Sequence, residues 1–351
     1  MKRFLGPAAG AVLVALSLWI VGIDDRVVDA QGATLHGRIV KSSGDVIVLD
    51  TAEGRRTFDP GRISVRVGLL TSFRPLSDRP DFMLAGLLAH LLAVVTVHLR
   101  WGVLLDAAGF PTTLLSVLRL GWIGQFFASV LPGGIATGDV VKALYAGEPQ
   151  GRRAHAATTV VLDRLLGLIV LCTIALLGAL LAPGSTRVGG SRAILAVLLG
   201  GGLLLLAVLL SPRLRAKAGL TRLVPRRFES IPAAAGKALA LYAGRGRWIR
   251  GAACVAVASQ ALVLFALYLY GCALGVQMSL FAVVAAIPVA QMLSAVPGLP
   301  GGFGFGDLAF VALLPDAGVP AGTALALSLT YKALHVLIAL PAGLWLRRYR
   351  P

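Results

Sequence analysis

The sequence predicts an all-α polytopic membrane protein with about six full transmembrane helices, two oppositely oriented re-entrant helical hairpins that form an inverted repeat, and a small β-rich insert. Hydrophobic residues make up 57% of the 351 residues and charged residues 14%, whereas soluble domains average about 25% charged residues. The apolar residues form runs of roughly 20, the length that an α-helix needs to cross the hydrocarbon core. Two of these runs are interrupted by the same Pro-Gly motif. This composition excludes a soluble enzyme.

The first apolar run, residues 4–23, predicts an N-terminal transmembrane anchor at 1–23. The alternative is a cleaved signal peptide with its cleavage site at Val28-Asp29-Ala30. The run is long for a signal peptide and that site lies well beyond its end. We therefore expect an uncleaved anchor.

Residues 24–81 form the only substantial polar segment and predict a small, barrel-like β-rich module outside the membrane. Alternating or β-branched residues predict strands at Thr34–Val40, Asp45–Asp50 and Arg62–Val67. Turns are expected at Ser43-Gly44-Asp45 and Glu53-Gly54-Arg55. Nothing in this segment resembles a catalytic constellation.

The remaining segment, 82–351, predicts the transmembrane domain. Five apolar runs in it are long enough to cross the membrane, at roughly 82–99, 155–182, 192–211, 251–274 and 321–346. Two further stretches, 112–147 and 280–316, contain Pro and Gly, and each predicts a helix–turn–helix hairpin. The three cysteines lie in apolar runs and offer neither a disulfide framework nor a zinc pattern.

The distribution of Lys and Arg predicts the orientation in the cytoplasmic (inner) membrane. Residues 212–250 contain ten basic residues and one acidic residue, Glu229, and the C-terminal tail adds Arg347, Arg348 and Arg350. Because cytoplasmic loops are enriched in Lys and Arg, we expect both segments inside. Counting crossings back places the N-terminus inside and 24–81 outside. The net charge of +17 does not indicate nucleic acid, because no soluble basic domain carries it.

An internal repeat is visible in the motif P-G-G-x-x-x-G-D. Its two copies lie 168 residues apart, at Pro132–Asp139 and Pro300–Asp307. A base follows each Asp after 25 residues, at Arg164 and Lys332. Repeat one covers about 112–182 and repeat two about 280–346. Three full spans separate the hairpins, so they should enter from opposite faces, as in the inverted repeats of many secondary transporters.

The charged residues of the repeat predict two ion pairs inside the membrane. A lone charge at a helix centre costs about 2.5–3.5 kcal/mol on insertion scales, so such residues are paired or functional. The pairs could form within each repeat or across the pseudo-twofold axis. A Gly-rich turn that exposes the N–H groups of a half-helix favours an anion such as phosphate. The alternative is tight hairpin packing with interhelical ion pairs and no ligand.

The candidate substrate-binding residues share this repeated motif or its basic partners. They are Pro132, Gly133, Gly134, Gly138, Asp139, Lys142, Arg164, Pro300, Gly301, Gly302, Gly304, Asp307 and Lys332.

The other polar residues give weaker evidence of function. No cofactor and no metal site is expected. A metal site would need His90, His98 and His335 to converge in space, and nothing in the sequence indicates that they do. Three glutamines more often bridge helices than bind ligands: Gln125, Gln260 and Gln291. Arg100-Trp101 is expected to be an interfacial anchor at the cytoplasmic end of its span. The sequence contains no P-loop, zinc-protease or nucleophile-elbow motif. The missing P-loop argues against ATP-driven pumping by this chain alone.

The same motifs resemble the flippase-like membrane domain of the lysylphosphatidylglycerol synthase/flippase family. The resemblance covers about 82–346 and rests on three segments: Arg100–Lys142, Asp163–Gly167 and Pro297–Asp307. Lys142 and Lys332 stand where the family usually has Arg, and Asp307 stands where it usually has Glu. These exchanges keep the charge but change reach and bidentate geometry.

The resemblance implies a fold that translocates a phospholipid or a phosphate-linked lipid carrier, with anionic or zwitterionic headgroups as partners. We expect neither an aminoacyl-transfer domain nor synthesis of lysyl-lipid, and so no enzyme. The alternative is a non-transporting membrane assembly or lipid-binding protein that docks a protein partner through 24–81. A third hypothesis, an intramembrane transferase acting on a lipid phosphate, rests only on the acidic residues.

Overall fold

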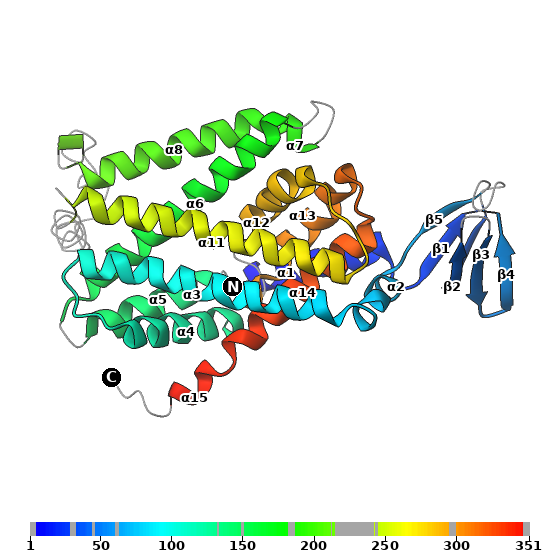
Figure 1. The fold of residues 1–351 in the computed structure, drawn as a ribbon, viewed down its shortest axis with the longest axis horizontal. Coiled ribbons are helices and arrows are strands. Elements are labelled where there is room, and N and C mark those ends of the chain that lie inside the picture. The colour runs from blue at the N-terminus through cyan, green and yellow to red at the C-terminus, as the bar shows by residue number, and fades with distance from the viewer. Residues whose placement is uncertain are drawn as a thin grey trace.

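The protein is a bundle of long apolar helices with a small β-sheet projecting from one end (Figure 1). The computed structural model describes residues 5–28, 33–43, 46–59, 63–131, 133–148, 151–181, 187–211, 213–214, 242, 245–294 and 300–346. Pro132, most of the basic segment 212–250 and the Arg-rich tail lie outside the described residues.

The helices make up most of the described chain. In chain order they are α1 (Leu5–Val21), α2 (Leu69–Phe73), α3 (Pro80–Ala107), α4 (Leu114–Val130), α5 (Ile135–Gly147), α6 (Arg153–Leu181), α7 (Arg187–Gly190), α8 (Arg192–Leu210), α11 (Gly246–Ala273), α12 (Ile287–Ser294), α13 (Phe305–Leu313), α14 (Ala321–Ala339) and α15 (Ala342–Leu346). Short 3₁₀ turns occur at Arg74–Ser77, Pro300–Gly302 and Leu314–Ala317, and a π-helical turn at Ala282–Ala286 leads into α12.

Five helical stretches among the described residues are long and apolar enough to cross a membrane: α3, α6, α8, α11 and the stretch Ala321–Leu346. They correspond to the five spans predicted from the sequence, and α3 runs eight residues past its predicted end at 99. These helices make the chain a multi-pass membrane protein. The described part of α1 has 17 residues, fewer than the roughly 20 needed for a full crossing, so the sixth crossing stays a prediction.

Residues 24–81 contain an antiparallel sheet of order β4-β3-β2-β1-β5. Its strands are β1 (Asp25–Val28), β2 (Thr34–Ser43), β3 (Val46–Thr51), β4 (Gly54–Phe58) and β5 (Ser64–Arg66). Three strands were predicted at nearly these positions, and β1 and β4 were not. Among the described residues β4 and β5 form the two edges of an open sheet, so the barrel-like shape was wrong. Its small core consists of Val27, Ile39, Ile47 and Leu49.

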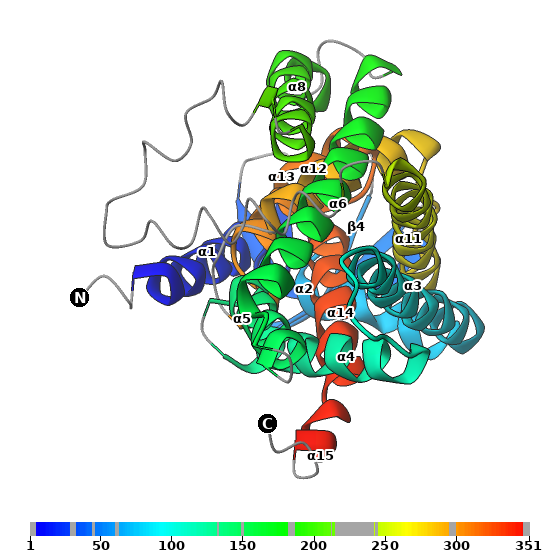
Figure 2. The ribbon, with the colours of Figure 1, turned by 90° about the vertical axis from the view of Figure 1, so that its left-hand side faces the viewer.

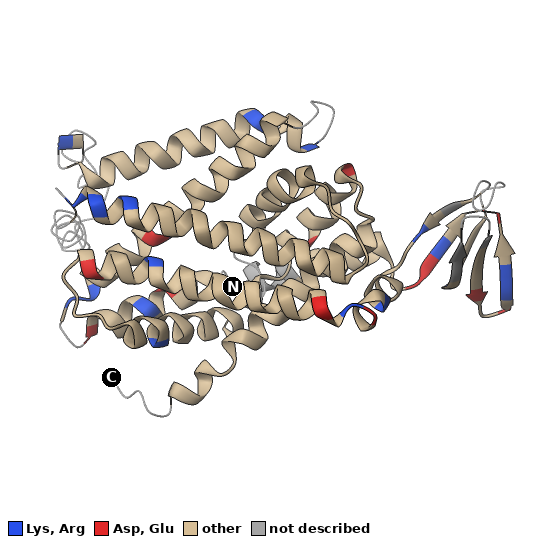
Figure 3. Cartoon of the chain, viewed as in Figure 1, with Lys and Arg blue, Asp and Glu red and all other residues tan. Residues whose placement is uncertain are grey.

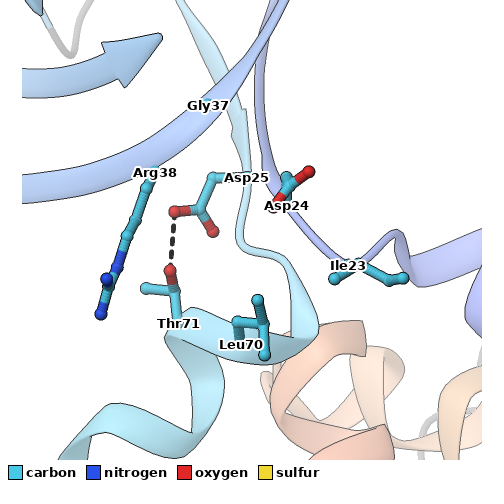
Figure 4. A pocket seen from close by; sticks show the side chains of 7 residues that line it. All are labelled: Ile23, Asp24, Asp25, Gly37, Arg38, Leu70 and Thr71. Atoms are coloured by element: carbon cyan, nitrogen blue, oxygen red, sulfur yellow. Dashed lines mark hydrogen bonds between the residues drawn. The ribbon is translucent and has the colours of Figure 1, made fainter. Parts of the chain in front are cut away.

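Asp25 joins the sheet to the helical bundle (Figure 4). It is buried, and its carboxylate accepts hydrogen bonds from Ile39 N (2.6 Å), Gly68 N (2.7 Å) and Thr71 Oγ1 (2.8 Å). A hollow of about 250 Å³ beside it is lined by Arg38 and other residues of this junction. Because three segments converge on one carboxylate, Asp25 fixes how the sheet leaves the bundle.

The repeat extends beyond the motif to whole helices. Figure 1 shows α3 starting at the sheet end and α11 starting at the opposite end, so the two equivalent helices run in opposite directions. The helices α6 and α14, which carry the repeated bases, are likewise opposed. The hairpin α4–α5 lies toward the end away from the sheet, and α12–α13 lies toward the sheet. Equivalent helices thus run in opposite directions, as the predicted inverted repeat requires, and re-entry of the hairpins into the membrane stays a prediction.

The ends of α3 and α11 repeat in atomic detail. Gly109 and Gly275 both have positive φ, 73° and 83°, as glycines that close helices do. In each case the next residue's N–H returns to the carbonyl five residues back: Phe110 to Leu105, and Val276 to Gly271. These matches extend the duplication to the helix that precedes each hairpin.

The first helix of each hairpin also starts alike. The Thr113 side chain accepts from Ser116 N, and the Ser279 side chain accepts from Ala282 N, so each caps its helix. These positions lie 166 residues apart, whereas the Gly-rich motifs lie 168 apart. Repeat two is therefore two residues longer before its motif. The π-helical turn Ala282–Ala286 absorbs an extra residue there, since π turns arise as insertions in α-helices.

Seen from the end away from the sheet, α14 lies in the middle of the bundle with α3, α4, α5, α6 and α11 around it (Figure 2). Two hydrophobic clusters build the core. One surrounds hairpin α12–α13, and the other surrounds hairpin α4–α5 with the facing ends of α3 and α6. Each hairpin thus has its own packed core, and α14 passes between them.

Candidate functional site

The hairpin α4–α5 turns at its Gly-rich motif. Gly133 and Gly134 have positive φ (93° and 53°), a conformation that residues with a Cβ rarely adopt. Neither α4 nor α5 is long enough to cross a membrane alone. The two helices are close because Gly138 faces Gly124, and a Cβ on Gly138 would lie 2.3 Å from the Gly124 carbonyl oxygen. The motif therefore allows both the turn and the close approach.

Asp139 on α5 pairs with the base predicted for it. Arg164 of α6 donates from Nε to Asp139 Oδ2 (2.6 Å) and from Nη2 to Oδ1 (2.8 Å). Lys142 Nζ lies 3.6 Å from the same carboxylate and over the ring of Trp101 at 5.4 Å. Two cations thus share one anion, which leaves this half of the site with an excess positive charge. A bidentate Arg presents the donor geometry that also fits phosphate.

The second hairpin places Asp307 equivalently on α13. Lys332 Nζ of α14 donates to Asp307 Oδ1 at 2.7 Å, so both ion pairs form within a repeat rather than across the axis. Asp307 also accepts from Ser328 Oγ (2.6 Å) and from Gly304 N (2.8 Å). Its carboxylate therefore caps the first turn of α13, whose N-cap residue is Gly304 with φ +117°.

Equivalent close packing occurs at the glycine before Asp307. A Cβ on Gly306 would lie 1.8 Å from Ser294 Oγ of α12 and 3.1 Å from Lys332 Nζ. Gly306 and Gly138 thus fill the same role in the two repeats. The turn itself, Pro300-Gly301-Gly302, forms a 3₁₀ turn that packs against α4 of the first hairpin. The tip of hairpin two therefore lies against hairpin one inside the bundle.

The two ion pairs differ in exposure. The Arg164 side chain is 38% exposed and Asp139 15%, whereas Lys332 is 6% exposed and Asp307 0%. Lys142, the third base, is also buried. Arg164 is therefore the most exposed of the three bases at the two ion pairs. The first pair is open to its surroundings and the second is closed.

Arg100 and Trp101 do not form the interfacial anchor expected from the sequence. Both are buried. Arg100 Nε and Nη2 donate to Asp163 at 2.6 and 3.0 Å, and Trp101 Nε1 donates to Thr159 Oγ1 at 2.9 Å. The expectation was wrong because α3 continues to Ala107 and carries this pair into the core. The charge of Asp163, directly before Arg164 in an apolar run, is the signal in the sequence that could have indicated a buried partner for Arg100.

Of the other polar residues singled out in the sequence, Gln125, His90 and His335 join helices, whereas Gln260 Oε1 has no partner among the described residues. Gln125 Nε2 donates to the His335 carbonyl at 3.5 Å, linking α4 to α14 as expected. His90 contacts His335, but His98 has no hydrogen-bond partner for either ring nitrogen in the described part of the chain. No group of three metal-ligating side chains occurs among the described residues.

The two helix starts that were predicted to bind an anion differ in the structure. The start of α13 is occupied by Asp307 itself, so it is not free for phosphate. The start of α5 has no side-chain cap and adjoins the pair with excess positive charge. Pro132, its first predicted residue, lies outside the described residues. Of the two predicted anion sites, the one beside Arg164 is therefore the more accessible in the described part of the chain, and anion binding there stays a prediction.

Charge is also distributed unevenly along the bundle (Figure 3). Within the helical bundle, Lys and Arg residues gather at the end away from the sheet, where α6 and α11 begin. This end is where hairpin α4–α5 lies.

Comparison with known proteins identifies the helical part. The family model described as the lysylphosphatidylglycerol synthase TM region matches residues 67–343. The match starts directly after β5, so the sheet and α1 lie outside it, and it begins earlier than the resemblance at 82 suggested. No curated protein and no solved structure matches the chain.

Proposed function

Since the chain belongs to the family of the lysylphosphatidylglycerol synthase TM region, we propose that it moves the headgroup of a phosphate-containing lipid across the cytoplasmic membrane by alternating access. The family supports a lipid-related function in the membrane. The substrate class follows from the site: a partly exposed Arg in a region of excess positive charge suits an anionic or zwitterionic phospholipid, or a phosphate-linked lipid carrier.

In this proposal the basic end of the bundle is cytoplasmic, which also places both termini inside and the sheet outside. Hairpin α4–α5 re-enters from the cytoplasm and hairpin α12–α13 from the opposite face. Irregular backbone at membrane depth is tolerated where protein or a water-filled cavity covers it. The packing of Gly138 on α4 and of Gly306 on α12 supplies such cover.

The observation that carries the proposal is the pair of equivalent ion pairs with unequal exposure. Packing alone does not require an Asp and a base at the same spacing in two inverted halves. With Arg164 accessible and Lys332 closed off, the structure has the asymmetry expected of one end state of a two-state transporter. In the other end state the roles of the halves would be exchanged.

The headgroup phosphate would compete with Asp139 for Arg164. Asp139 holds the guanidinium in place while the site is empty and takes it back on release. Lys142 keeps the local charge positive throughout, because its ammonium lies within 3.6 Å of the same carboxylate. The proposal involves no bond making or breaking, no cofactor and no nucleic acid.

The test is a leaflet-accessibility assay in proteoliposomes of phosphatidylcholine that contain a trace of acyl-labelled NBD-phosphatidylglycerol, with dithionite added outside. Arg164→Gln removes the bidentate donor and should slow translocation about tenfold or more, since a hydrogen bond to a charged group contributes about 1.5–3 kcal/mol. Asp307→Asn should slow translocation similarly, because it breaks the ion pair with Lys332 that closes the second half of the site.

The matched control is Arg153→Gln on the same helix, α6. Arg153 pairs with Glu148 at the surface, where ion pairs contribute little, so translocation should be unchanged. Translocation that is unaffected by both Arg164→Gln and Asp307→Asn would contradict the proposed site.

A second function is favoured by one observation: the sheet of residues 25–66 lies outside the family match and projects from the bundle (Figure 1). We infer that it serves as a docking module for an envelope protein, with the bundle as lipid-binding anchor. Deleting the strands should then abolish a co-purifying partner while translocation persists. If deletion leaves every co-purifying protein in place, this role is excluded.

A further inference from the structure

A cluster of titratable side chains lies apart from the ion pairs, where α3, α11 and α14 meet. His90 Nε2 and His335 Nδ1 are 3.1 Å apart and share a hydrogen bond. His90 Nδ1 is 3.2 Å from the Tyr270 hydroxyl. The His90 ring also stacks on Tyr331, with ring centroids 4.5 Å apart and planes at 9°. Two imidazoles and a phenol therefore form a continuous hydrogen-bonded chain inside the bundle.

The duplicated fold does not require this cluster. At the offset of 166 that holds before the motif, the position of His90 corresponds to Ala256. At the offset of 168 that holds after it, the position of His335 corresponds to Gly167. The cluster thus breaks the symmetry that the ion pairs obey. His90 and Tyr270 are buried, and placing ionisable side chains within membrane spans is costly, so such groups mark ion or proton pathways by default.

The cluster is linked to the helices that carry both ion pairs. His335 follows Lys332 by three residues on α14, and these positions lie on one face of a helix. The carbonyl of His335 accepts from Gln125 of the other hairpin. The remaining titratable neighbours of the pair are His98 of α3, Tyr331 of α14 and Arg164 of α6, which acts electrostatically on His335. Both bases of the repeat are therefore near the pair.

We propose that the His90–His335 pair binds one proton and couples its passage to the movement of an anionic headgroup. This inference rests on the proposed function. A proton added at Nε2 of His335, which has no hydrogen-bond partner among the described residues, makes that ring an imidazolium. Its Nδ1–H then donates to His90 Nε2, and His90 Nδ1–H donates to the Tyr270 oxygen. A second proton would place two N–H groups face to face and break the shared hydrogen bond.

The sign of the coupling follows from charge. The bound proton adds one positive charge beside Arg164 and Lys332, so the site attracts an anion more strongly while the proton is present. Proton and anionic headgroup should therefore cross together. A metal ion is a poorer occupant, because no three metal ligands converge in the described part of the chain.

The experiment imposes a gradient of one pH unit across phosphatidylcholine vesicles that contain the protein and NBD-phosphatidylglycerol. With one proton per headgroup, the steady-state ratio between the leaflets should shift by up to about tenfold toward the alkaline side. Pyranine trapped inside should report acidification as headgroups move inward. His335→Asn keeps a nitrogen near the Nδ1 position but cannot bind the proton; it should translocate without responding to the gradient.

His36→Gln is the matched control, because His36 is an exposed histidine of the sheet; it should keep the full gradient response. His90→Asn should behave as His335→Asn does, and pyranine acidification in wild-type vesicles decides the matter if either variant fails to fold. Wild-type translocation that ignores the gradient, or a full response in both variants, overturns the coupling alone. A wild-type protein that translocates no headgroup overturns the proposed function and the coupling together.

Discussion

Replacing Asp307 by Asn should destabilise the folded protein by about 3–5 kcal/mol, because it leaves the Lys332 ammonium buried without its partner. The Asp307 side chain is 0% exposed and Lys332 6%, so solvent cannot compensate the lost charge. The carboxylate also holds Gly304 N and Ser328 Oγ, and Asn offers one oxygen to three donors. Replacing Asp307 by Asn and Lys332 by Met together removes both charges and should recover most of the loss.

The equivalent change at the first pair should cost much less. Arg164 is 38% exposed, so solvent screens the charge that Arg164→Gln leaves on Asp139, and the cost should be about 1 kcal/mol or less. Unfolding of the purified protein by denaturant in mixed micelles measures all three variants. If Asp307→Asn costs no more than Arg164→Gln, or if the double variant is no more stable than Asp307→Asn alone, the closed second site is refuted.

Three further perturbations test other parts of the structure. Arg100→Gln should destabilise the bundle by about 3–5 kcal/mol in the same unfolding assay, because it strands Asp163 in the core; a cost below 1 kcal/mol would show that the pair is solvated. Gly138→Ala should cost about 1–3 kcal/mol by forcing α5 away from the α4 carbonyl, whereas Gly200→Ala on α8, where a Cβ meets open space, should be neutral; equal effects would contradict the close packing. Asp25→Asn should speed amide hydrogen exchange in the sheet while leaving the helices protected, and unchanged exchange would remove its anchoring role.

The helical architecture could be predicted because it depends on composition and periodicity. Runs of roughly 20 apolar residues fix where spans occur, and a Gly-rich motif inside such a run indicates a turn. The pairing of Asp139 with Arg164, and of Asp307 with Lys332, followed from the cost of unpaired charge in lipid. The choice between pairing within a repeat and across the axis needed the structure, because spacing alone does not say which helices lie together.

The misses have equally physical causes. Arg100 stands near the end of an apolar run, and hydropathy cannot tell a cation that anchors an interface from one that is buried beside a partner 63 residues away. The strands β1 and β4 are short and carry charged residues, so they show little alternation. Asp307 occupies the start of α13 because the backbone turns at Gly304. A Gly-rich sequence permits such a turn but does not say at which glycine it occurs.

The most direct test of a two-sided site inside the bilayer is the accessibility of the hairpin tip. Ile135, 37% exposed at the start of α5, is replaced by Cys in a protein whose own cysteines are replaced by Ser, and membrane-impermeant maleimide is applied from either face of oriented vesicles. His36→Cys in the sheet, the control, should react from one face only. The account predicts that Ile135→Cys reacts from both faces as the two end states exchange. Reaction from a single face under all conditions would describe a fixed pocket and would contradict alternating access.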